Sequence, residues 1–254
     1  MIVKDVYNAI NSAADFSLAM GFDNVGLLVG DPDAMVKGVL IALDVTDNVI
    51  DEAVARGANL IVTHHPVIFN PMKRVTADTL VWRLIRADIS VISAHTNLDI
   101  AKGGVNDILA QTLGLEEVVM LEQTSDGEGL GRIGTLPRGM TPPEFAYYVK
   151  RMLNAGAVRY CDGGCAIEKV AVGGGSCGSL LDVVAKSGCQ AFVTGDVKHD
   201  VMLDAVHRGI TLIDAGHFCT ENLVVEYLAK LTQDVLGETP VMIAKSNIDV
   251  ATTI

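Results

Sequence analysis

Short apolar runs that end in a threonine and are followed by polar side chains occur in both halves of this chain. In the first half, the run that ends at Thr63 precedes His64 and His65. The next run precedes His95, and Asp99 follows four residues later. Short runs rich in Val and Ile are typical of buried strands in a parallel sheet. The first half is therefore expected to contain such strands, with polar side chains just beyond their ends.

The second half repeats this order. The run that ends at Thr194 precedes Asp196, and a further run precedes His217, with Glu221 four residues later. Repetition of this kind indicates an α/β fold of two similar lobes that arose by duplication. Ligands of open α/β sheets lie beyond the carboxyl ends of the strands. If both sets of side chains face one cleft, they could hold two divalent cations.

The residue types favour particular metals. Imidazole and carboxylate groups together suit zinc, iron, manganese or nickel, whereas oxygen-only ligands would indicate magnesium or calcium. A single histidine or a single His-x-x-x-Asp would ordinarily be a polar loop. Because a histidine pair and two His–carboxylate pairs recur at strand ends, the sequence predicts a metal site, with the identity of the metal left open.

Composition excludes several classes of protein. The chain has 254 residues, 50% of them hydrophobic, and no apolar run approaches the roughly 18 residues of a membrane-spanning helix. Its net charge of −12 argues against general nucleic-acid binding. The N-terminal residues lack the apolar core of a secretory signal, and five scattered cysteines suit a reducing compartment. We therefore expect a cytoplasmic protein with no membrane or nucleic-acid partner.

The expected layout has three parts. A first α/β lobe covers residues 1–122, a connecting strand–helix segment covers 123–167, and a second α/β lobe covers 168–254. No low-complexity linker separates the lobes, so one shared fold is predicted. The helices expected from apolar spacing and from helix-start signals include residues 47–56, 76–86, 106–113, 142–153, 180–186 and 220–236.

Several segments resemble a known family. They are Asp23–Gly30, Thr63–Pro66, Ser93–Asp99, Thr194–His199 and Gly216–Glu221. In this order, and over nearly the whole chain, they resemble the Nif-three-like family, also called YbgI-type proteins and often labelled GTP cyclohydrolase I type 2 homologs. The resemblance implies two similar intertwined α/β/α lobes and assembly into a homohexameric toroid. The chain lacks the large domain that some longer members insert between the lobes.

The same resemblance implies the ligands of a dinuclear metal centre with two divalent ions per subunit. The family's ligands map onto His64, His65, Asp99, His217 and Glu221, and this sequence departs from the family at none of these positions. We expect Glu221 to bridge the two ions, because the sequence predicts it near the start of a helix from which it can reach both.

Two further polar residues are candidates for a catalytic role. His95 aligns with His217 across the repeat and is expected either to act as an acid or base, or to support a ligand from outside the metal's coordination shell. A structural role at the end of its strand is the alternative. Asp196 occupies the position of His65 in the repeat, with Lys198 and His199 on the same loop. These three residues either line the cleft or belong to a solvated loop.

Other motifs have simpler interpretations. The segment Gly173–Ser179 follows a predicted strand and precedes a helix, where backbone N–H groups can bind an anion, but a close strand-to-helix turn is favoured. Asp23–Leu27 is expected to be a tight turn that leads into a strand, and the family resemblance adds the alternative that it lines the cleft. Cys161 and Cys165 lack a second pair at zinc-site spacing, so they are interpreted as ordinary thiols. His207 is expected at the surface.

Two functions remain open from the sequence. The first is a metal-dependent hydrolase that acts on a phosphorylated or heterocyclic small molecule, with GTP ring opening as the family label implies. The second is a non-catalytic role in metal handling or in regulated protein interaction. No residue pattern identifies a guanine pocket. Turnover of a substrate would favour the first function, and transfer of metal without turnover would favour the second.

Overall fold

The computed structural model describes residues 1–122 and 129–252, which form two compact units. The first unit contains residues 1–101 and 224–248, and the second contains residues 102–223 with the C-terminal stretch from Asp249. Each unit has its own sheet. The chain therefore leaves the first unit, builds the second, and returns to complete the first.

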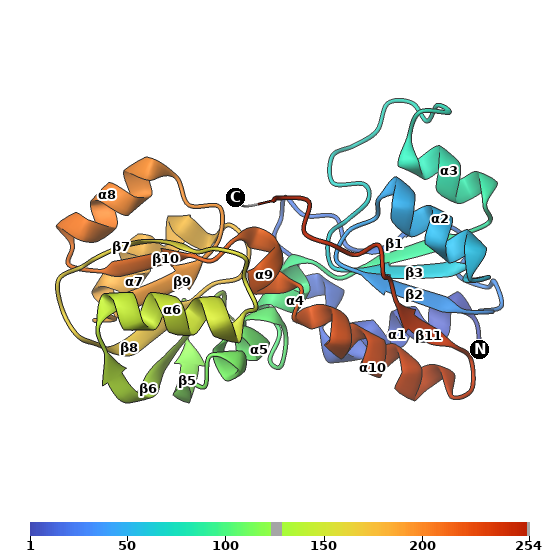
Figure 1. Ribbon diagram of the computed structural model, residues 1–254. Helices are drawn as coiled ribbons and strands as arrows, with labels where there is room; N and C mark the ends of the chain where they lie inside the picture. Colours follow the sequence, from blue (N-terminus) through green and yellow to red (C-terminus); the bar gives the residue numbers. More distant parts are fainter. Residues whose placement is uncertain (123–128, 253–254) are drawn as a thin grey trace. The chain divides into compact units, whose positions relative to one another are not determined.

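The first unit is a five-stranded sheet with helices on both faces (Figure 1). Its strand order is β1-β4-β3-β2-β11, in which β1 is antiparallel to β4 and the other neighbours are parallel. Its elements are α1 (Val3–Ala13), η1 (Phe16–Leu18), β1 (Gly26–Val29), β2 (Val39–Ala42), α2 (Asp47–Ala55), β3 (Leu60–Thr63), α3 (Leu80–Arg86), β4 (Ser90–Ser93), α4 (Thr96–Ile100), α10 (Val224–Leu236) and β11 (Val241–Ile243).

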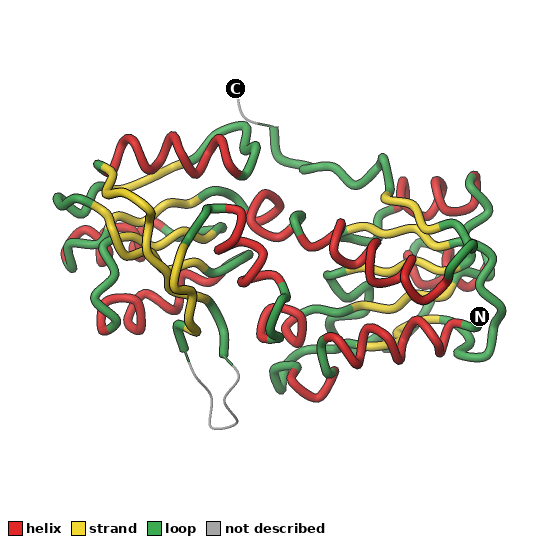
Figure 2. Tube along the Cα trace, turned by 90° about the horizontal axis from the view of Figure 1, so that it is seen from below, coloured by secondary structure: helices red, strands yellow, loops and turns green. Residues whose placement is uncertain are grey.

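Burial on both faces explains the continuous apolar runs of this sheet. Every residue of β2, β3 and β4 is buried. Figures 1 and 2 show α1 and α10 together on one face and α2 and α3 on the other. Strands covered on both faces need apolar side chains at every position rather than at alternate ones. The predicted buried parallel strands are confirmed in this unit.

The second unit is a six-stranded mixed sheet. Its order is β5-β6-β8-β9-β10-β7, with β8, β9 and β10 parallel and the remaining pairs antiparallel. Its elements are α5 (Val105–Thr112), β5 (Glu116–Met120), β6 (Arg132–Met140), α6 (Pro142–Met152), β7 (Arg159–Cys161), β8 (Ile167–Val172), η2 (Cys177–Leu180), α7 (Leu181–Lys186), β9 (Ala191–Thr194), α8 (His199–His207), β10 (Thr211–Asp214) and α9 (His217–Glu221).

Alternate residues of the central strands enter two separate cores. Val170 and Val193 pack with α5 and α6 on one face, whereas Ala171 and Phe192 pack with α7 and α8 on the other. Successive side chains of a strand point to opposite faces, so one apolar run supplies both cores. No helix in the described part of the chain is long and apolar enough to cross a bilayer.

The predicted helix over residues 220–236 is wrong in one respect. The structure contains two helices, α9 and α10, and Glu221 is the last residue of α9 rather than near the start of a longer helix. Helix α9 begins early because Gly216, with φ of 85°, turns the chain after β10. The Thr220 hydroxyl then bonds the carbonyls of Gly216 and His217. The bridging role expected for Glu221 therefore cannot rest on a helix start.

Two other boundaries differ from the expected ones. Helix α3 begins at Leu80 rather than at residue 76, because the Thr79 hydroxyl accepts a hydrogen bond from the Trp82 amide and caps the helix there. The expected lobe boundaries, after residues 122 and 167, do not coincide with the division after Ala101 and Leu223. Positions 123–128, where the connecting segment was expected to begin, lie outside the described residues.

Candidate metal centre

Three histidines meet at one edge of the first sheet. His64 and His65 follow β3, and His95 follows β4, its parallel neighbour in the sheet. One ring nitrogen of each histidine lies within 4.8 Å of those of the other two. The Thr63 hydroxyl accompanies this turn, because it donates to the carbonyl of His65 at 2.9 Å. The predicted gathering of side chains beyond the strand ends is confirmed for these three residues.

Each of these histidines is held at its Nδ1 atom by an oxygen. The partners are the carbonyl of Ala94 for His64, at 2.8 Å, and the carboxylates of Asp44 and Asp23 for His65 and His95, at 2.7 and 2.8 Å. A carbonyl or a carboxylate accepts, so Nδ1 carries the proton and donates it. Nε2 of each neutral ring then keeps its lone pair. This is the state in which imidazole binds a metal.

Asp99 lies on α4 and faces the same group of histidines. Its Oδ1 atom is 3.5 Å from Nε2 of His64, and both residues are buried. A carboxylate and an imidazole that point at each other at this distance leave a location that both could coordinate. The first unit therefore brings together His64, His65, His95 and Asp99, four of the seven residues singled out in the sequence.

Asp23 holds His95 in a defined orientation. Burial alone would raise the pKa of the Asp23 carboxyl, but hydrogen bonds from His95 and Thr96 outweigh it and keep the pKa well below its usual range. The carboxylate therefore remains ionised and accepts from Nδ1 of His95. The sequence favoured a tight turn at Asp23, with a place in the cleft as the alternative from the family resemblance. Its contact with His95 was not predicted, because nothing in the pattern connects this residue with a histidine that follows much later in the chain.

Two exposed phenylalanines lie beside His95. The ring of Phe69 is 6.1 Å from that of His95, and the ring of Phe22 is 6.3 Å from that of Phe69. Their exposed fractions are 44% and 64%. The two loops that carry them are joined by a hydrogen bond from the Asn24 side chain to the carbonyl of Ile68, at 2.6 Å. Large exposed apolar side chains next to polar ligands provide a surface for a flat apolar group.

The second unit presents a smaller set. His217 begins α9, and its Nε2 atom lies 2.8 Å from Oε2 of Glu221, one helical turn later. Its Nδ1 atom bonds Oδ2 of Asp196, at 2.7 Å. Asp196 follows β9 and adopts a positive φ of 51°, which turns its side chain toward the loop after β10. Asp196 thus lies against His217, as a supporting residue would.

A glycine loop closes around Glu221. A Cβ atom on Gly175 would lie 2.1 Å from Oε1 of Glu221 and 3.2 Å from Nε2 of His217. Only glycine leaves space for the carboxylate here, and the positive φ of 64° at this residue also favours glycine. The loop after β8 therefore shapes the environment of the Glu221 carboxylate.

Four backbone amides of the same loop already have acceptors within the protein. The N–H groups of Gly174, Gly175 and Cys177 donate to the side chains of Asn106, Thr220 and Thr194. The N–H group of Gly173 bonds the carbonyl of Val193. These contacts support the close strand-to-helix turn over the alternative of phosphate binding.

Other predicted residues lie apart from these two sets. Lys198 precedes α8 at the N-cap position and His199 is the first residue of the helix, and both side chains are exposed. His207, at the end of the same helix, is exposed as predicted. Asp44 has a role that the sequence did not suggest, since only the structure shows its contact with His65. Its place shortly after β2, at the same sheet edge as His65, is the signal that could have identified it.

Comparison with known proteins identifies the family. Two α/β units that carry histidines and carboxylates beyond parallel strands define a protein with candidate metal-binding groups. The family model described as Duf34/NIF3 (NGG1p interacting factor 3) matches residues 1–250, and the chain belongs to this family. The resemblance noted in the sequence is thereby confirmed.

Curated relatives carry one shared name. A protein of Clostridium acetobutylicum, named GTP cyclohydrolase 1 type 2 homolog, is 38% identical over 97% of both chains. A relative of the same name from Clostridium perfringens is 39% identical over 87% of both chains. The alignment with a Staphylococcus epidermidis relative runs over 342 positions, which exceeds the 254 residues of this chain. That relative therefore contains additional sequence.

Solved structures show the same fold. The Staphylococcus aureus hypothetical protein SA1388 superposes with a TM-score of 0.93 at 31% identity, covering 100% of this chain and 99% of that one. A structure described as reduced HcgD, from Methanocaldococcus jannaschii, gives a TM-score of 0.82 at 29% identity, covering 96% and 98%. The predicted α/β Nif-three-like fold is confirmed.

Proposed function

We propose that this protein binds two divalent metal ions and hydrolyses a small molecule that carries a heterocyclic or phosphorylated group. The proposed ligands are those that the family resemblance implies: His64, His65, Asp99, His217 and Glu221. One observation carries the proposal: the ring nitrogens of three histidines converge beyond β3 and β4, and each Nδ1 atom is held by an oxygen acceptor.

The chemistry of the donors fits divalent metals. An imidazole whose Nδ1–H is donated to an oxygen is fixed in orientation and presents the lone pair of Nε2. His64 and His65 have this arrangement, and Nδ1 of His217 is likewise held by Asp196 while its Nε2 atom faces the Glu221 carboxylate. Together with the carboxylates of Asp99 and Glu221, they form a mixed nitrogen and oxygen set that suits zinc, iron, manganese or nickel.

Two metal ions in such a centre would lower the pKa of a shared water molecule and polarise the bond that the water attacks. The chain's own residues would orient the reactants. His95, held at Nδ1 by Asp23, is proposed to exchange a proton with the substrate at its Nε2 atom. Asp196 is proposed to keep the ring of His217 in position.

The aromatic pair supports a substrate with a planar ring. Phe22 and Phe69 are exposed, and Phe69 lies next to His95. A heterocycle could pack against these side chains while its reacting bond faces the histidines. The shared name of the relatives, which refers to GTP cyclohydrolase, is compatible with such a substrate.

Metal content and turnover should be measured on one sample. Protein purified without added metal is analysed for its elements and then tested against GTP and a panel of phosphoesters. We expect two ions per chain and turnover of at least one compound. In His65→Ala one of the two ions and the turnover should be lost. His207→Ala, which changes an exposed histidine on α8, is the matched control and should retain both.

The outcomes separate the two functions. Two ions without turnover of any compound would favour metal handling, and transfer of the ions to an acceptor protein would then be measured. Full metal content with unchanged affinity in His65→Ala would contradict the proposed centre. Two ions bound with unchanged affinity by Glu221→Gln would contradict the bridging role of Glu221. Light scattering would test the homohexamer that the resemblance implies.

A further inference from the structure

A basic stretch stands out in an acidic chain. The whole sequence has a net charge of −12, but residues 129–160 contain five arginines and lysines and a single acidic residue, Glu144. These residues include β6, α6 and β7 of the second unit. The stretch therefore carries a local positive charge against the overall field of the protein.

Two of its five basic side chains have structural partners. Arg132 is buried and donates to both carboxylate oxygens of Asp107, at 2.6 and 3.0 Å. Arg159 pairs with Asp214 and also donates to the carbonyl of Val197. These two arginines stabilise the packing of the unit, and their charge is already neutralised.

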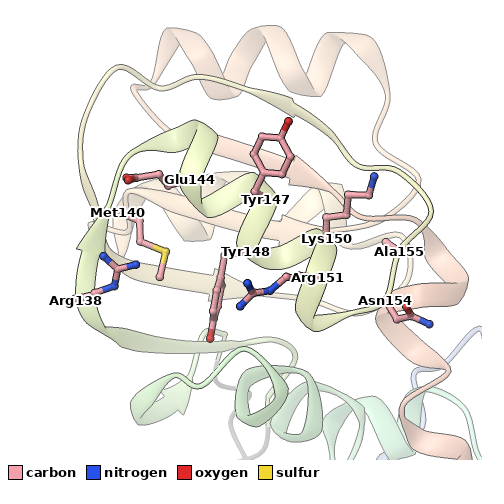
Figure 3. Close-up of a pocket in the computed structure, with 9 residues that line it drawn as sticks. All are labelled: Arg138, Met140, Glu144, Tyr147, Tyr148, Lys150, Arg151, Asn154 and Ala155. Carbon is pink, nitrogen blue, oxygen red and sulfur yellow. The ribbon is translucent and has the colours of Figure 1, made fainter.

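The other three basic side chains line one cavity. Arg138, at the end of β6, and Lys150 and Arg151, in the last turn of α6, border a cavity of about 670 Å³ (Figure 3). No acidic side chain in the described part of the chain lies within ion-pair distance of any of them. Small-molecule sites commonly have volumes of about 300–1,000 Å³. The cavity is thus large enough for more than a single phosphate ion.

A fixed aromatic ring forms part of the wall. The Tyr148 hydroxyl donates to the carbonyl of Leu113 at 3.0 Å, and its ring stacks with Phe145 at 6.4 Å. Figure 3 shows the side chains of Arg138 and Arg151 on opposite sides of Tyr148, and all three line the same cavity. A ring held at both ends loses little entropy when a planar ligand stacks on it.

Neither the dipole of α6 nor the one nearby acid explains why three basic side chains line this cavity. Lys150 and Arg151 would each gain a few tenths of a kcal/mol from the dipole at the end of α6, but Arg138 belongs to β6 and gains nothing from it. Glu144, the one acid at the cavity, accepts from the Thr141 amide and hydroxyl in a capping box. Its carboxylate is engaged at the other end of the helix and also interacts electrostatically with Arg138, but this one acid faces three basic side chains, so the cavity keeps a net positive charge.

We propose that this cavity binds a phosphorylated small molecule of mononucleotide size. The guanidinium groups of Arg138 and Arg151, which flank the Tyr148 ring, suit phosphate oxygens, and the planar group packs on Tyr148. None of the proposed metal ligands lines the cavity, so this site is a second one on the protein.

Calorimetric titration with guanosine monophosphate (GMP) tests the proposal. The full chain is used in a buffer with EDTA, so that no metal ion contributes to binding. We expect GMP to bind and the uncharged nucleoside guanosine to bind at least about tenfold more weakly, because the charge-assisted bonds to phosphate are lost. The double variant Arg138→Ala/Arg151→Ala should weaken GMP binding by at least about tenfold.

Two controls separate the cavity from other effects. Arg86→Ala changes an exposed arginine in the last turn of α3 and should bind GMP as the unaltered protein does. His65→Ala/His217→Ala removes proposed metal ligands and should also leave GMP affinity unchanged. Thermal unfolding of each variant shows that it is folded.

Several results would overturn the proposal. They are the absence of GMP binding at millimolar concentration, unchanged affinity in the folded double variant, and equal affinity for GMP and guanosine. Equal affinity for GMP and inorganic phosphate would overturn the mononucleotide size, because the planar group would then contribute nothing.

Discussion

The two units present their candidate ligands in different ways. In the first unit, three histidines and Asp99 gather beyond adjacent strands, and His64 is completely buried. In the second unit, a single histidine, His217, pairs with Glu221, and its side chain is 32% exposed. Zinc sites in proteins use three or four protein ligands. The difference indicates that the first unit could hold one ion by itself, whereas the second offers two donors and depends on others.

The largest expected effect on metal affinity comes from two single variants, each of which removes one histidine from a different unit. His64→Ala should weaken the tighter ion by more than about a hundredfold, since loss of a ligand exceeds the 10–100-fold effect of losing a supporting residue. His217→Ala should lose the weaker ion but keep the tighter one within about tenfold. Metal titration followed by elemental analysis measures both. Equal losses in the two variants would contradict the difference between the units.

A glycine substitution tests how closely the second unit surrounds its carboxylate. Gly175→Ala places a Cβ atom 2.1 Å from Oε1 of Glu221 and also requires alanine at positive φ. We expect the free energy of unfolding to fall by about 2–4 kcal/mol, and we expect the weaker ion, to which Glu221 is a proposed ligand, to bind less tightly. Gly188→Ala is the matched control, because its φ of 73° is similar but nothing lies within 4 Å of the added atom. That variant should lose only about 1 kcal/mol. Urea unfolding curves compare the two, and similar losses would show that the contact with Glu221 is unimportant.

Supporting carboxylates allow a matched comparison between the units. Asp44→Asn in the first unit and Asp196→Asn in the second each replace the acceptor of a histidine Nδ1–H. Each should lower metal affinity by about 10–100-fold, because a neutral amide oxygen holds the Nδ1–H group less strongly than a carboxylate and makes the ring a less basic ligand. Competition with a chromogenic chelator measures the affinity. If only Asp44→Asn has an effect, His217 does not need its carboxylate partner.

The smallest expected effect on stability concerns the contact between α2 and the chain segment that follows β11 in the first unit. Glu52 on α2 accepts hydrogen bonds from the amides of Lys245 and Ser246 and from the Ser246 hydroxyl. Burial alone would raise the pKa of the Glu52 carboxyl, but these bonds outweigh it and lower the pKa to about 2. A lowered pKa stabilises the folded state above pH 4.5, and this contribution is lost as the pH falls toward 2.

Glu52→Gln should therefore lower the free energy of unfolding at pH 7 by about 1–3 kcal/mol. The difference from the unaltered protein should shrink between pH 4.5 and 2. Glu226→Gln, which changes an exposed residue of α10, is the control and should have little effect. Denaturant unfolding at several pH values provides the measurement, and a difference that persists at pH 2 would contradict this origin.

The sequence predicted the candidate metal ligands better than the carboxylates that hold the histidine rings in place. His64, His65 and His95 were expected beyond strand ends, because apolar runs and the polar residues after them are local features. The contacts of Asp23 and Asp44 with histidines were not predicted, because they join distant parts of the chain. Which carboxylate meets which histidine is decided by strand order, and strand order is not written in any short segment.

Short edge strands were also missed. Strand β11 has only three residues, directly after Pro240, and most residues of β5 are exposed. The sequence therefore contains little that distinguishes either strand from a loop. Such strands owe their conformation to the neighbour they pair with rather than to their own composition. The central strands, by contrast, were evident from their apolar runs, since burial on both faces leaves a clear pattern.

Strand β11 has a consequence for how the protein is made. It pairs with β2, although the two are separated by the whole of the second unit in the chain. During synthesis, residues 1–101 leave the ribosome first but lack β11 and α10, which arrive near the end. Residues 102–223 emerge as one continuous stretch, and domains generally fold as units as they emerge. The part of the protein translated second is therefore the one able to fold first, while the earlier part waits for the last to arrive.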